Sequence, residues 1–129
     1  MDIQSFSPNL MVYNVQDSVD YYQELLGFEL VQSVPNEKNM LQWAMMKKNN
    51  FIIMFQEIEN MQSEIPYFKE NSPGGSLSFY IKIENIQLFY DNVKESYRLV
   101  SDLNKTFYNT LEFSISDING YILTFAQDI

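Results

Sequence analysis

The sequence predicts an α+β protein built from two tandem β-α-β-β-β units, and an internal repeat is the main reason. Segment 50–58 is similar to segment 119–129 at an offset of 70 residues (125 − 55), and segment 12–22 is similar to segment 80–90 at an offset of 68 residues (83 − 15). Each copy also shows one amphipathic helical pattern followed by three strand patterns. Two copies at such long spacing indicate a duplicated unit, because solenoids stack three or more short repeats.

The whole chain of 129 residues has the length of a single domain, and its 46% hydrophobic content is sufficient for one core. We therefore expect one domain over 1–129, with the first unit at 5–58, a connector at 59–75 and the second unit at 76–129. Pro66, Pro73 and a Gly-Gly pair mark the connector, in which we expect a short helical turn before Pro66.

The first unit begins with a strand and continues with a helix, for which Asp17 or Ser18 is the expected N-cap. The apolar stripe of this helix recurs at helical spacing (Val19, Tyr22, Leu25 and Leu26), and Gly27 is placed to end the helix in a left-handed conformation. Three strands follow, at 28–34, 40–46 and 51–57, separated by turns at Pro35-Asn36 and Asn49-Asn50.

The second unit shows the same order. Alternating apolar residues at Leu77, Phe79, Ile81 and Ile83 predict its first strand. Asn85 is the expected N-cap of a helix that extends to about Tyr97. Strands are then predicted at 99–103, 111–116 and 121–127, with a turn at Asn119-Gly120 before the last one.

Composition excludes several kinds of chemistry. The chain has no cysteine and no histidine, so disulfides, thiolate ligands and imidazole bases are absent. A net charge of −9 disfavours nucleic acid as a partner and favours either a cationic ligand or simple solubility. No apolar stretch approaches the length of a membrane span, and no signal region begins the chain, so we expect a cytoplasmic protein.

Five segments, in this order and spacing, resemble motifs of the vicinal-oxygen-chelate superfamily of glyoxalases, extradiol dioxygenases, fosfomycin-resistance enzymes and bleomycin-resistance proteins: 17–22, 26–28, 79–85, 108–113 and 117–125. The bleomycin-resistance-like branch is the most similar, although Asn109 and Leu111 stand where that branch has glycine and arginine. The resemblance implies a curved mixed sheet around a cavity, helices on its outer face, and a homodimer.

Metal-dependent members of this superfamily hold a divalent ion at four inward-facing positions, which the resemblance places at Leu10, Met54, Ser78 and Thr124. Leucine and methionine cannot supply the oxygen or imidazole donors that such an ion prefers. We therefore expect no metal and no cofactor, with an oxygen-only site as the less favoured alternative.

Strand alternation defines the residues that should line the cavity. The expected cavity face contains Leu10, Val12, Asn14, Ile52, Met54, Ser78, Tyr80, Ile122, Thr124 and Ala126. From this face and the nearby loop we select a ligand-binding set, and no catalytic residue: Leu10, Val12, Met54, Ser78, Tyr80, Tyr108, Glu112 and Thr124.

Glu112 is the most informative member of this set. It is either a half-buried charge that faces the ligand, or a strand-end residue that lies in solvent or pairs with Lys82. Trp43 aligns with Phe113 in the repeat, which favours a place in the core, and the methionines Met40, Met45, Met46 and Met54 are either adaptable ligand contacts or core filling.

Three functions fit these residues. The first is a metal-free binding protein of the bleomycin-resistance type that sequesters a small cationic or aromatic compound, such as an antibiotic. The second is a metal-independent isomerase or glyoxalase-like lyase that uses Glu112 with Tyr80 or Tyr108 for proton transfer. The third is a scaffold or regulatory module with an unused pocket. We favour the first, because no acid and base occur at a recognisable catalytic spacing.

Overall fold

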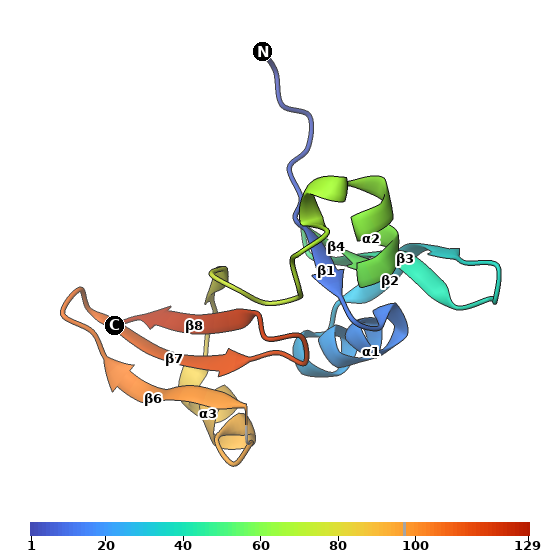
Figure 1. Cartoon of the computed structure of the whole chain (residues 1–129). Helices are drawn as coiled ribbons and strands as arrows, with labels where there is room; N and C mark the ends of the chain where they lie inside the picture. Colours follow the sequence, from blue (N-terminus) through green and yellow to red (C-terminus); the bar gives the residue numbers. More distant parts are fainter. Residues whose placement is uncertain (97) are drawn as a thin grey trace. The chain divides into compact units, whose positions relative to one another are not determined.

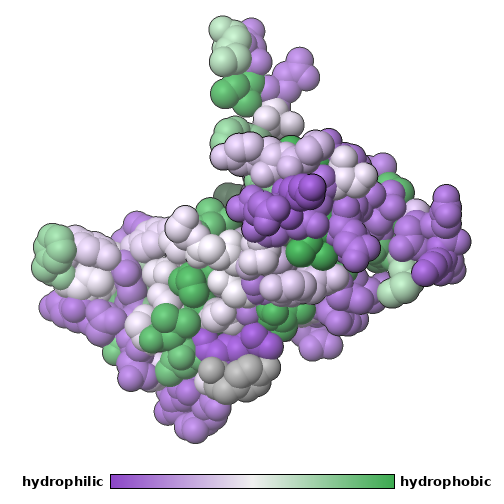
Figure 2. All heavy atoms as spheres, viewed as in Figure 1, coloured by the Kyte–Doolittle hydropathy of each residue, from purple (hydrophilic) through white to green (hydrophobic). Residues whose placement is uncertain are grey.

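The computed structural model describes residues 1–96 and 98–129 (Figure 1). The chain divides into two compact units, Met1–Pro73 and Gly74–Ile129, which are described one at a time below. Within the described residues, no helix is both long and apolar enough to span a membrane. Hydrophilic residues cover most of the surface visible in Figure 2, as expected for a chain with a net charge of −9.

Unit 1 contains one four-stranded mixed sheet with the strand order β1-β4-β3-β2, in which β1 runs parallel to β4. Its elements are β1 (Asn9–Val12), α1 (Val15–Leu26), β2 (Glu29–Pro35), β3 (Leu41–Lys48), β4 (Phe51–Glu57), α2 (Ile58–Glu64) and the short 3-10 helix η1 (Pro66–Phe68). Helix α2 is the helical turn that the sequence predicts before Pro66.

Unit 2 has the equivalent strand order, β5-β8-β7-β6, with β5 parallel to β8. Its elements are β5 (Ser78–Lys82), α3 (Ile86–Val93), β6 (Leu99–Lys105), β7 (Thr110–Ser116) and β8 (Ile122–Asp128). The predicted α+β fold with two tandem β-α-β-β-β units is therefore confirmed, with one four-stranded sheet in each unit. The predicted end of its helix, at about Tyr97, lies outside the described residues.

The caps of α1 explain both of its ends. Asn14 is the N-cap, and its side-chain oxygen accepts a hydrogen bond from the backbone N–H of Asp17 at 2.8 Å. The prediction of Asp17 or Ser18 as N-cap was wrong, because Asn14 already satisfies an N–H group of the first turn. Gly27 has a φ of 74°, and its backbone N–H bonds to the carbonyl of Gln23, which confirms the predicted left-handed end.

Helix α3 begins at the predicted N-cap, Asn85, but by a different mechanism. Asn85 has a φ of 55° and makes no capping hydrogen bond with its side chain. Instead, the Gln127 side chain on β8 accepts a hydrogen bond from the backbone N–H of Ile86 at 2.8 Å. A strand residue distant in sequence therefore satisfies one of the N–H groups at the start of the helix.

Each helix packs against one face of its own sheet. In unit 1 the ring of Tyr22 on α1 lies 5.0 Å from the ring of Phe55 on β4, and both side chains are buried. In unit 2 Phe89 on α3 lies 4.8 Å from Phe125 and 5.9 Å from Phe113. These aromatic contacts fix which residues point to the helix and which point to the other side of the sheet.

Candidate functional site

The candidate site lies on the face of the unit 2 sheet opposite α3. The strand register aligns Tyr80 of β5 with Thr124 of β8, and Glu112 of β7 with Ala126 of β8. Facing residues in a ladder point to the same side of the sheet, so these side chains share one face. The small side chains of Thr124 and Ala126 leave room for Tyr80 to extend across β8 toward Glu112.

Three hydroxyl groups hold the Glu112 carboxylate. The Tyr80 hydroxyl donates to Oε2 at 2.6 Å, and the Thr110 hydroxyl donates to the same oxygen at 2.9 Å. Tyr108 also bonds to this carboxylate through its hydroxyl. The structure therefore brings together three of the predicted ligand-binding residues, Tyr80, Tyr108 and Glu112.

Thr110 and Thr106 are site residues that the sequence analysis missed. The two threonine hydroxyls lie 2.7 Å apart, and the backbone N–H of Thr110 donates to Thr106 Oγ1 at 3.1 Å. Since the Thr110 proton is used on Glu112, the Thr106 hydroxyl donates to Thr110, which gives a continuous chain of hydrogen bonds. The available signal was the spacing of Thr110, two residues before Glu112 on the same strand face.

The hydrogen bonds shift the pKa values of the acid and the phenols in opposite directions. Burial alone would raise the pKa of Glu112, but the hydrogen bonds from Tyr80, Thr110 and Tyr108 outweigh it and lower the pKa below its ordinary value. The hydrogen bond to Glu112, with a smaller contribution from burial, raises the pKa of Tyr80 and that of Tyr108. At neutral pH the carboxylate is ionised and both phenols are protonated.

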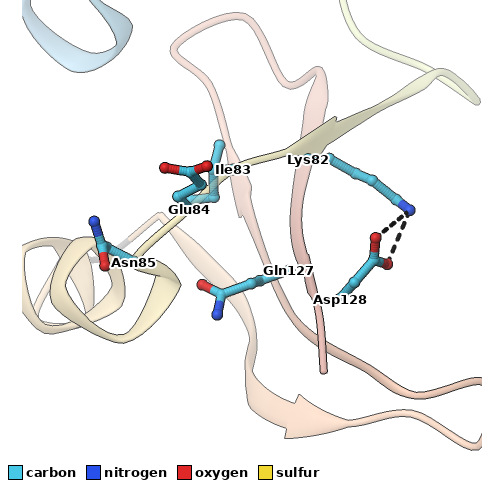
Figure 3. Close-up of a pocket in the computed structure, with 6 residues that line it drawn as sticks. All are labelled: Lys82, Ile83, Glu84, Asn85, Gln127 and Asp128. Carbon is cyan, nitrogen blue, oxygen red and sulfur yellow. Dashed lines mark hydrogen bonds and ion pairs between the residues drawn. The ribbon is translucent and has the colours of Figure 1, made fainter.

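Lys82, the alternative partner of Glu112, is bound elsewhere. Its Nζ lies 2.9 Å from Asp128 Oδ1 and 3.1 Å from Oδ2, and Figure 3 shows the two side chains pointing toward one another. They line an open pocket of about 530 Å³ at the end of β5, together with Ile83, Glu84, Asn85 and Gln127. The structure therefore shows Glu112 bonded to hydroxyls, and the predicted pairing with Lys82 was wrong.

Thr124 and Ser78 complete the predicted residues of unit 2. Thr124 Oγ1 and Ser114 Oγ lie 2.8 Å apart, which extends the row of hydroxyls along this face. Ser78 is exposed on β5 and aligned with Ile122, so it also lies on the face opposite α3. The predicted orientation of the unit 2 strands is confirmed, whereas the ligand-binding role of these residues stays a prediction.

The predicted orientation of β1 in unit 1 was wrong. Leu10 pairs with Phe55 and Val12 pairs with Glu57, which places Leu10 and Val12 on the α1 face, where both are buried. The repeat offset explains the error: α1 begins at Val15 and α3 at Ile86, an offset of 71 (86 − 15) and not 68. The difference of three is odd, and an odd shift moves every side chain to the opposite face.

Met54 and Trp43 lie on the face of the unit 1 sheet opposite α1. Met54 pairs with Met45, and Trp43 pairs with Gln56, one position away from Phe55 in each case. The expected alignment of Trp43 with Phe113 in the core was therefore wrong, because Ala44 is the residue that pairs with Phe55. Trp43, Met45 and Met54 are only half-buried, so this face offers apolar surface.

The four positions that the resemblance assigns to a metal do not form a ligand set in this chain. Leu10 faces α1, Met54 offers a thioether, and Thr124 shares its hydroxyl with Ser114. Across the described part of the chain, no group of three or more aspartates or glutamates could hold a metal ion. These donors do not fit a hard divalent cation.

Together, the two units and their sheet order define a small α+β protein with a duplicated β-α-β-β-β architecture. The chain belongs to the Glyoxalase/Bleomycin resistance protein/Dioxygenase superfamily, whose family model matches residues 4–125. A search of curated proteins gave no significant match.

Solved structures show the same fold. A glyoxalase/bleomycin resistance protein/dioxygenase from Nocardioides has a TM-score of 0.78 at 13% identity, covering 100% of this chain and 86% of that chain. A glyoxalase-related enzyme from Clostridium phytofermentans has a TM-score of 0.74 at 16% identity, covering 100% and 98%. TioX from Micromonospora sp. ML1 has a TM-score of 0.71 at 15% identity, covering 97% and 99%. Identities this low show a shared fold and nothing finer.

We predict that Glu112 contributes to stability in a pH-dependent way. Its pKa is lowered by folding, so its contribution is present above the ordinary value of 4.5 and is lost as the pH falls through the lower pKa of the folded state. The free energy of unfolding should therefore fall more steeply below that ordinary value in the unsubstituted protein than in Glu112→Gln. Urea titrations of both proteins at several pH values measure this, and parallel pH profiles would contradict it.

Proposed function

We propose that this protein reversibly binds a small organic molecule in the cytoplasm, without a metal ion and without chemical conversion. The observation that carries the proposal is the Glu112 carboxylate, held by the hydroxyls of Tyr80, Thr110 and Tyr108 on a sheet face that no helix of its own unit covers. Preorganised polar groups beside accessible aromatic rings are typical of small-molecule sites. An antibiotic is one compound of this kind that the superfamily membership brings into consideration.

The same geometry argues against the alternative, a metal-independent isomerase or lyase. A general acid and base work best when their pKa values lie near the operating pH. Here the hydrogen bonds raise the pKa of Tyr80 and Tyr108 and lower that of Glu112, so each pKa moves away from neutrality. A carboxylate that stays ionised beside phenols that stay protonated is suited to recognition, and it is poorly suited to proton transfer.

We also propose a homodimer. The face of the unit 1 sheet opposite α1 carries half-buried Trp43, Met45 and Met54, and Val34 on the same face is 38% exposed. Apolar surface of this kind is more stable when a second molecule or a ligand covers it. The superfamily resemblance supports a symmetric pair of chains as that arrangement.

Native mass spectrometry of the purified full chain tests these proposals together. We expect the mass of a dimer, saturable retention of an added small organic ligand, recovery of that ligand unchanged, and no stoichiometric metal. A monomer at every concentration would contradict the dimer. A tightly held equivalent of metal, or release of an altered ligand, would contradict the metal-free binding function.

A further inference from the structure

The charge of Glu112 has no internal counter-ion among the residues that the structure describes. The ion pairs in that part of the chain join Lys82 to Asp128 and Lys94 to Asp91. The groups that bond to the Glu112 carboxylate are neutral hydroxyls, which stabilise the charge without cancelling it. A half-buried, ionised carboxylate of this kind attracts an external cation.

The hydrogen bonds already present limit which cation fits. A carboxylate offers about four acceptor positions, two on each oxygen. Tyr80 and Thr110 occupy both positions on Oε2, and Tyr108 takes a third on the carboxylate. About one position remains, which suits a cation with a single N–H donor, whereas a guanidinium that bonds through two parallel N–H groups needs two.

The surroundings of this remaining position are aromatic. Tyr80 is 52% exposed and Tyr108 is 51% exposed, although the hydroxyls of both rings bond to Glu112. The exposed ring carbons therefore provide apolar surface next to a negative charge, which is the combination that binds alkylammonium groups.

A second tyrosine–carboxylate pair in the same unit provides an internal comparison. The Tyr90 hydroxyl donates to Asp102 at 3.1 Å, and Lys94 Nζ lies 5.9 Å from the centre of the Tyr90 ring. At that pair the protein supplies its own ammonium group. At Glu112 the described residues supply none, so an equivalent position stays open for a ligand.

We propose that Glu112, Tyr80 and Tyr108 bind the tertiary alkylammonium group of a small organic cation. The single N–H of the cation would donate to Glu112 Oε1, and its alkyl groups would contact the two tyrosine rings. This inference rests on the proposed small-molecule binding function and names the chemical class of its ligand.

Calorimetric titration of the full chain with three probes tests the proposal. The probes are N,N-dimethylbenzylammonium, benzyltrimethylammonium, which has no N–H donor, and benzyl alcohol, which has no charge. We expect the first to bind roughly tenfold more tightly than benzyl alcohol, since a charge-assisted hydrogen bond accounts for about that factor. We expect the second to bind with intermediate affinity.

Two matched variants locate the effect. Glu112→Gln keeps an acceptor for the hydroxyls but removes the charge, and it should reduce binding of N,N-dimethylbenzylammonium to the level of benzyl alcohol. Asp102→Asn removes the same charge from the comparison pair and should leave binding unchanged. If Glu112→Gln does not fold, raising the salt from about 0.01 M to about 1 M should weaken binding of the cation to the unsubstituted protein without affecting benzyl alcohol.

The outcomes separate this inference from the proposed function. Equal affinity for the cation and benzyl alcohol, or full binding of the cation by Glu112→Gln, would overturn the ammonium assignment while leaving small-molecule binding intact. The same holds if no probe binds but native mass spectrometry shows a different retained compound. Absence of any saturable ligand in both experiments would overturn the assignment and the proposed function together.

Discussion

Phe55→Glu should prevent unit 1 from folding, whereas Met54→Glu, one residue earlier on β4, should leave it folded. The Phe55 side chain is completely buried and packs against Tyr22 of α1. Loss of a buried phenylalanine costs about 3 to 5 kcal/mol, and an unpaired buried carboxylate adds several more. The sum is comparable to the roughly 5 to 15 kcal/mol that stabilises a whole domain.

Met54 points to the opposite face of the same strand, where it is half-buried beside Met45. A carboxylate at this position can reach water, so we expect a loss of less than about 2 kcal/mol. Circular dichroism melting curves of both variants measure the difference. If Phe55→Glu melts normally and Met54→Glu is unfolded, the two faces of the unit 1 sheet have been exchanged in our description.

The strands and their order were predictable from sequence because alternation and turn residues are local signals. The predicted strand at 51–57 coincides with β4, and the other predicted strands differ from the observed ones by one or two residues at their ends. In unit 2 the alternation of Phe79 and Ile81 continues into the register with β8, so the predicted faces were correct. Local patterns were sufficient wherever an element could be assigned by itself.

The faces of unit 1 were not predictable, because they depended on aligning two diverged copies. Phe51 and Tyr121 align at 70 residues, but the helix starts align at 71 (86 − 15), and the sequence match over the first strand suggested 68. A strand has a period of two residues, so an error of one or three residues reverses its faces completely. Leu10 and Trp43 were misplaced for this single reason.

The hydrogen bonds of Glu112 were also beyond sequence analysis. Tyr80 and Glu112 are 32 residues apart and lie on strands that are not neighbours, because β8 separates β5 from β7. Their contact depends on the small side chain of Ala126, which is completely buried next to Glu112. Parity identified Glu112 as a residue of this face, but only strand order and register reveal its partners.

The second large effect is expected at Asp117, in the turn between β7 and β8. Its Oδ1 accepts hydrogen bonds from the backbone N–H groups of Asn119 and Tyr121, each at 2.9 Å. Asp117 is only 1% exposed, and Asn119 and Tyr121 are buried as well. Asp117→Ala would leave two buried N–H groups without this acceptor, and each unsatisfied group costs about 1 to 3 kcal/mol.

We therefore predict that Asp117→Ala lowers the free energy of unfolding by roughly 2 to 5 kcal/mol. Asp117→Asn keeps a side-chain oxygen in the same place and should lose less. Asp102→Ala removes an exposed carboxylate from the same unit and should change the free energy by no more than about 0.5 kcal/mol. Urea unfolding of the three variants measures these differences. Equal losses in Asp117→Ala and Asp102→Ala would show that the turn does not depend on the Asp117 carboxylate, and that the glycine at position 120, with a φ of 91°, is sufficient to set its course.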